Sequence, residues 1–207
     1  MRYTRFALLT LVALFPMPAA AHHPTGGVVP ATFFHGLLSG LGHPVIGLDH
    51  LSFVVGVGIF AGISGLGLAL PLMFVTFMAA GLALHIVSVT IPGAEILIGL
   101  SAVAVGLAIV WSGRRGSRWP EGAFFALAGT VHGYAFAESI VGAETGVLAA
   151  YVLGLVVVQL GIAAGACLAT RIIVESRHRF APAATRAAGL AIVATGTLFA
   201  IRASGFA

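Results

Sequence analysis

Charged residues are scarce in this sequence of 207 residues, where Asp, Glu, Lys and Arg together make up 8%. Soluble globular proteins carry about 25%. So few charges could not cover a surface exposed to water, whereas a surface facing lipid tolerates their scarcity, and the mean hydropathy of +1.10 agrees. The composition therefore argues against a soluble domain and predicts an all-α, polytopic bundle of transmembrane helices.

Lysine is absent, and cysteine occurs once, as Cys167 within an apolar run. The ten arginines form no basic face interleaved with aromatic residues, so the net charge of +4 does not indicate a nucleic-acid partner. One cysteine can form neither an internal disulfide nor a thiolate cluster. Any metal site must therefore use histidine and carboxylate side chains, and the chain has eight His and six Asp or Glu.

Residues 1–21 have the pattern of a cleaved secretory signal peptide. A basic start with two arginines precedes an apolar core at 6–15, which is too short to span a bilayer of about 30 Å. Small alanines then predict cleavage after Ala21, which would place His22 and His23 on the outer side. An uncleaved N-terminal anchor is the alternative.

Six apolar runs follow, each long enough for a helix to cross the bilayer. Proline lies at or near the start of the first four, where its missing N–H is tolerated. Residues 28–42 are apolar but too short to span, and they predict a short outer helix or a re-entrant segment. The predicted organisation is a signal peptide (1–21), a periplasmic segment (22–43) and a six-helix transmembrane domain (44–207). The spans are predicted at 44–63, 67–90, 93–112, 121–141, 146–170 and 184–203.

Arginine placement predicts the direction in which the spans cross. With the mature N-terminus outside, the loops at 112–120 and 171–183 face the cytoplasm, and they hold six of the ten arginines. The outer connections at 90–93 and 139–146 hold none. This asymmetry follows the positive-inside rule and agrees with the orientation that a signal peptide demands. We expect a bacterial inner-membrane protein whose mature N-terminus and C-terminus are both periplasmic.

Ionisable side chains within the predicted spans gather in the outer half of the membrane. Such residues are costly in lipid and usually functional. If they converge from separate helices, their imidazole nitrogens and carboxylate oxygens suit nickel, cobalt or zinc, whereas copper(I) would need soft thiolate ligands. The six candidate metal ligands are His43, Asp49, His50, His85, His132 and Glu138.

Other polar residues are assigned lesser roles. Pro44 disfavours helical geometry at His43, so this histidine is expected to fold back over the outer mouth of the bundle. Supporting hydrogen bonds or an amide oxygen are expected from Tyr134, Ser139 and Gln159. Metal capture at the outer surface is assigned to His22, His23 and His35.

Two blocks of the sequence carry a family resemblance. Residues 43–50, HPVIGLDH, and residues 132–144, HGYAFAESIVGAE, resemble the first-span and later His-Gly motifs of the HupE/UreJ family of membrane proteins. The resemblance implies nickel or cobalt uptake, often beside hydrogenase or urease systems. Many members of that family carry a second histidine where this sequence has Phe136, which leaves the metal open. The metal-handling residues it implies are His43, Asp49, His50, His132 and Glu138.

We expect a secondary permease for a divalent metal ion, with the ion and the lipid bilayer as partners, and not an enzyme. No permanently bound cofactor is expected. The sequence contains no P-loop, and nothing in it implies an ATPase subunit. Two alternatives remain, namely a membrane cytochrome with histidine-ligated haem and a metal-dependent intramembrane hydrolase, although the motif H-E-x-x-H is missing.

Overall fold

The computed structural model describes residues 29–111, 118–176 and 179–205, and this part of the chain is helical throughout, without strands. The predicted signal peptide, with His22 and His23, lies outside the described residues. The elements are α2 (Phe33–Ile46), α3 (Leu48–Ser64), α4 (Ala69–Ile86), α5 (Ala94–Val110), α6 (Arg118–Phe136), the 3-10 turn η1 (Ala137–Ser139), α7 (Thr145–Glu175) and α8 (Ala181–Ala203).

Three helices, α4, α7 and α8, are each long and apolar enough to cross a membrane. The pair α2 and α3 meets the same test together but is bent by 80° at its break, and α5 is a shorter apolar helix of 17 residues. The chain is therefore a helical membrane protein with three or four candidate spans. Six spans remain a prediction.

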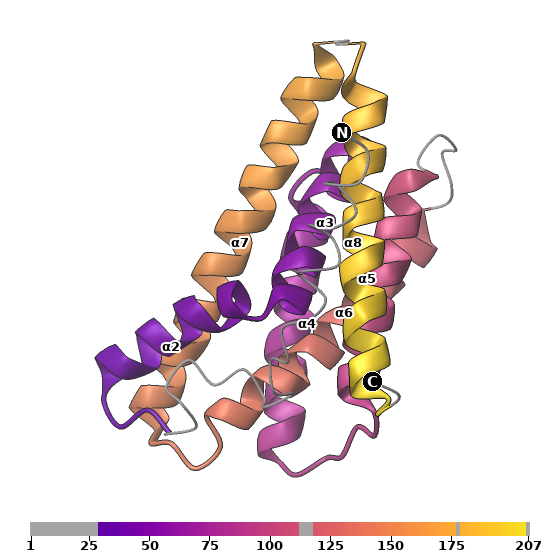
Figure 1. Cartoon of the computed structure of the whole chain (residues 1–207). Helices are drawn as coiled ribbons and strands as arrows, with labels where there is room; N and C mark the ends of the chain where they lie inside the picture. Colours follow the sequence, from indigo (N-terminus) through magenta and orange to yellow (C-terminus); the bar gives the residue numbers. More distant parts are fainter. Residues whose placement is uncertain (1–28, 112–117, 177–178, 206–207) are drawn as a thin grey trace, which may run out of the picture.

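The helices alternate in direction (Figure 1). α7 rises to the top of the view, where the chain turns into α8, and α8 returns to the bottom. η1 lies at the bottom, and α2 crosses the lower part of α7 at a slant. Two ends of the bundle can thus be named, the η1 end and the α7–α8 end. The arginine pattern predicts that the η1 end faces the periplasm, and this orientation remains a prediction.

Close helix packing depends on glycine at the helix crossings. α4 packs on α6, where a Cβ added at Gly133 would overlap the carbonyl of Met78 and one at Gly81 would overlap the carbonyl of Thr130. Such small residues let two backbones approach closely in lipid, where no hydrophobic effect drives helices together. α5 and α8 meet in the same way, since a Cβ at Gly99 would lie 2.8 Å from the carbonyl oxygen of Gly196.

The outer helix begins and ends later than predicted. α2 begins after Thr32, whose hydroxyl accepts from the backbone N–H of His35, and continues through Pro44 to Ile46. The predicted helix start at Pro44, and with it the non-helical His43, is wrong. The break falls at Gly47 instead, because a Cβ there would lie 3.0 Å from Cδ2 of the His50 ring.

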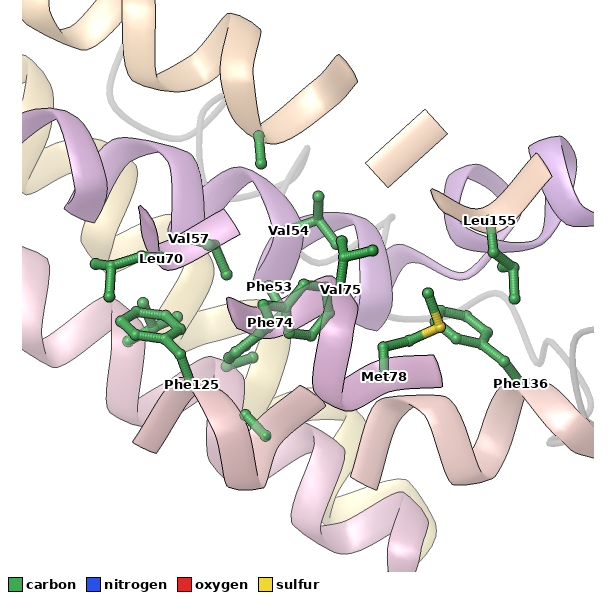
Figure 2. Close-up of a cluster of buried hydrophobic side chains, with 14 of the residues drawn as sticks. Phe53, Val54, Val57, Leu70, Phe74, Val75, Met78, Phe125, Phe136 and Leu155 are labelled. Atoms are coloured by element: carbon green, nitrogen blue, oxygen red, sulfur yellow. The ribbon is translucent and has the colours of Figure 1, made fainter. Parts of the chain in front are cut away.

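The buried core lies between α3, α4, α6 and α7. Phe53 and Phe74 lie beside each other in the centre of Figure 2, with ring centroids 5.3 Å apart. Phe136 and Met78 lie toward the right of that view. The two central rings also contact the ring of His132, so the apolar core directly borders the polar residues described next.

Candidate metal site

Two buried imidazoles meet at the junction of α3 and α6. Nδ1 of His50 lies 2.9 Å from Nδ1 of His132. His50 is in the first turn of α3 and 4% exposed, and His132, one turn before the end of α6, is 0% exposed. The two histidines are 82 residues apart in the sequence and meet through tertiary packing of the helices. Two nitrogen ligands are thereby brought within contact of each other inside the bundle.

A serine of α5 sets the tautomers of this histidine pair. The Ser101 hydroxyl donates to the carbonyl of Ile98 at 2.7 Å, so its oxygen accepts from Nε2–H of His132 at 3.0 Å. His132 then has a lone pair on Nδ1, and the proton between the two rings belongs to Nδ1 of His50. His132 is thus held by Ser101 with its Nδ1 lone pair directed at His50.

We expect the substitution Ser101→Ala to weaken nickel or cobalt binding by about tenfold, the lower range for loss of a residue that orients a metal ligand. Without the hydroxyl, nothing selects the Nε2–H tautomer of His132. Titration calorimetry of the purified protein in detergent measures the effect. Thr195→Ala on α8 removes a hydroxyl that bonds only its own helix, and it should bind metal normally. Equal affinities in the two variants would contradict the assignment.

A second polar cluster adjoins the pair on the side of η1. Nδ1 of His43 lies 2.8 Å from the hydroxyl of Tyr151 and 3.2 Å from that of Ser139. The Tyr151 hydroxyl also donates to the carbonyl of Phe136 at 2.8 Å. All these side chains are buried. The ring centroids of His43 and His50 are 6.0 Å apart, so the two clusters are neighbours.

The sequence profile of the HupE / UreJ protein family matches residues 9–199, nearly the whole chain. The chain belongs to the HupE/UreJ family. Protein HupE of Rhizobium leguminosarum bv. viciae is 34% identical over 114 residues, which are 54% of this chain and 56% of that protein. The match therefore spans little more than half of that relative's length. No solved structure matches the chain.

Within this HupE/UreJ protein the six predicted ligands do not gather at one point. His50 and His132 form the pair, and His43 lies in the adjoining cluster. In the described ranges no three His, Cys, Asp or Glu side chains are placed to hold a metal ion together. Three of the six predicted ligands, His43, His50 and His132, are thus neighbours in the described part of the chain, and the full ligand set remains a prediction.

The remaining three candidate ligands belong neither to the histidine pair nor to the His43 cluster. Asp49 is buried, and its Oδ1 accepts from the backbone N–H of His50 at 2.8 Å, so the carboxylate fixes the start of α3 beside the pair. His85 bonds the carbonyl of Tyr134 at 2.8 Å, and the two rings stack at 4.3 Å. Glu138 is exposed on η1.

Among the residues predicted to support the site or to capture metal at the surface, only some lie near the histidines. Ser139 belongs to the His43 cluster, whereas Tyr134 packs on His85. Gln159 is fully buried on α7, where Nε2 donates to its own helix and Oε1 has no hydrogen-bond partner among the described residues. His35 is exposed on α2.

Two functional partners were missed by sequence reasoning. Ser101 and Tyr151 lie inside apolar runs of α5 and α7, and each bonds a histidine of another helix. A buried hydroxyl in lipid needs a hydrogen-bond partner. A systematic search for hydroxyls inside the predicted spans would therefore have placed both on the list of candidates.

Proposed function

We propose that this HupE/UreJ protein is a secondary permease that carries nickel or cobalt from the periplasm to the cytoplasm, with His50 and His132 as direct ligands of the ion in transit. It is proposed to act without enzymatic chemistry and without a resident cofactor. The observation that supports the proposal is the pair of buried Nδ1 atoms, 2.9 Å apart, contributed by two separate helices.

The chemistry of the pair suits a divalent transition metal. Imidazole nitrogen is a ligand for nickel, cobalt and zinc, and the 2.9 Å between the two Nδ1 atoms is the length of the hydrogen bond between the rings, so this distance does not distinguish the three metals. For an ion to bind, the proton on Nδ1 of His50 would move to Nε2 of the same ring and both rings would turn toward a common point. Water or carbonyl oxygens would complete the coordination.

The energetics of inward passage also support the proposal. A membrane potential that is negative inside favours entry by about 2.3 kcal/mol per charge for each 100 mV, hence by about twice that for a divalent ion. Uptake therefore needs no ATP. The family's association with nickel and cobalt uptake points in the same direction.

Neither alternative from the sequence gains support from the geometry. The axial ligands of a haem lie on opposite faces of the porphyrin, and rings whose Nδ1 atoms are 2.9 Å apart leave no room for one between them. An intramembrane hydrolase needs a general base beside its metal. Glu138, the one glutamate among the candidate ligands, is exposed on η1.

Uptake of labelled nickel and cobalt into proteoliposomes with an imposed potential tests the proposal. We expect His50→Ala and His132→Ala each to lower the initial rate by about 100-fold, since a chelating pair is lost when either member goes. Thr170→Ala, a buried substitution on α7 away from the pair, should transport normally. Normal uptake by both histidine variants would refute the proposal, and so would an intact protein that admits neither metal.

A further inference from the structure

Aromatic rings cover both members of the histidine pair. The ring of Phe136 stacks on that of His50 with centroids 4.3 Å apart and an interplanar angle of 35°. The ring of Phe53 stacks on that of His132 at 4.4 Å and 33°. Both phenylalanines are 0% exposed. Each member of the pair is therefore buried against the face of a buried aromatic ring.

The two covering rings lie toward opposite ends of the bundle. Phe136 is the last residue of α6 and directly precedes η1. Phe53 follows His50 by one turn on α3, which runs away from the η1 end. In Figure 2 the two rings are well separated, Phe53 beside Phe74 and Phe136 near Met78. One ring thus closes each side of the pair.

We infer that the structure is an occluded state of the permease, in which Phe136 is the gate toward the η1 end and Phe53 is the gate toward the α7–α8 end. This inference rests on the proposed function, since it assigns the route by which the ion reaches and leaves the pair. His43, whose ring is 5.1 Å from that of Phe136, lies at the entrance.

The backbone changes its helix type after Phe136, whereas Phe53 lies within a continuous α-helix. α6 changes there from α-helix to 3-10 turn, and the N–H of Ile140 donates to Ala137. The Phe136 carbonyl instead accepts from the hydroxyls of Tyr151 and Ser139, the same groups that bond Nδ1 of His43. An ion could bind Nδ1 of His43 if the proton there moved to Nε2 of the same ring, and it would then compete with these hydroxyls, which would couple its arrival to the gate.

Two gates that open in turn explain how a bound ion passes without a continuous pore. When the Phe136 side chain moves aside, the ion enters with its remaining water. When the side chain returns, the ion lies among apolar side chains, where electrostatic interactions are strong. Movement of the Phe53 side chain then releases the ion on the other side. Such local rearrangements of side chains and short backbone segments set the rate in many gated sites.

Thiol accessibility tests the gates without any metal present. In a Cys167→Ala background, Ser101→Cys places a single reactive thiol beside His132. A membrane-impermeant methanethiosulfonate is applied to right-side-out and to inside-out vesicles. We expect slow labelling from both sides, about tenfold faster labelling from one side only with Phe136→Ala, and the same gain from the opposite side only with Phe53→Ala.

The matched control is Phe60→Ala, which empties a buried aromatic position two turns beyond Phe53 on α3, where the ring packs on Phe125. It should leave labelling slow from both sides. Gains from the same side in both gate variants, no gain in either, or equal gains with Phe60→Ala would overturn the gate assignment. Phe136→Leu and Phe53→Leu serve where the alanine variants do not fold. Because the labelling uses no metal, its failure is distinct from a failure of uptake by the histidine variants.

Discussion

Replacing Gly133 by valine is expected to abolish the folded protein. A Cβ at this position would overlap the backbone carbonyl of Met78, and the valine methyl groups would extend the clash. Backbone atoms of a packed helix cannot turn aside as the end of a flexible side chain can. Overpacking of this kind costs about 1–3 kcal/mol where neighbours can adjust. We expect at least the upper value here, because added Cβ atoms at Gly81 and Gly129 would also overlap backbone carbonyls across the same helix crossing.

The amount of monodisperse protein extracted from membranes and its melting temperature in detergent measure this effect. Gly161→Val on α7 provides the control, since a Cβ at that glycine meets nothing within 4 Å. Both substitutions exchange a helical glycine for valine, so they share the cost of side-chain entropy in a helix. Equal stability of the two variants would show that the crossing of α4 and α6 tolerates a wider separation than the structure indicates.

A double-mutant cycle at the histidine pair is expected to show almost complete non-additivity. His50→Ala and His132→Ala should each weaken nickel binding by about 100-fold, and the double variant should bind no more weakly than either one. The reason is geometric, because both nitrogens serve one ion and the first deletion already destroys the chelate. Titration calorimetry in detergent at fixed pH provides the dissociation constants.

A second cycle, between His50 and His85, separates a shared ion from a general loosening of the fold. His85 bonds the Tyr134 carbonyl of α6 and packs on the ring of the same residue. Its alanine variant should change nickel affinity by less than about twofold, and its effect should add to that of His50→Ala. Additive losses for His50 and His132 would mean that the two rings bind separate ions or none, and the transit site would have to be sought elsewhere.

Some features of the site followed from local sequence. The block at residues 43–50 predicted that His43, Asp49 and His50 lie near a helix start. The His-Gly block at residues 132–144 indicated His132 as a metal ligand. The structure agrees that His50 and His132 are buried. It departs at Pro44, which was expected to begin the span and lies instead inside α2. A proline restricts the residue before it but does not forbid helix there, and the helix ends instead at Gly47, where the backbone is extended and a Cβ would lie 3.0 Å from the His50 ring.

The sequence by itself determined that this is a helical membrane protein, because scarcity of charge and long apolar runs are properties of each segment read alone. It also determined which few ionisable groups could serve a metal ion. Only the tertiary structure decided that His50 meets His132, that Ser101 and Tyr151 hold the histidines, and that Glu138 faces outward. Apolar helices are alike on every side as far as lipid is concerned, so hydropathy does not specify which faces meet. The glycine contacts between particular backbones make that choice.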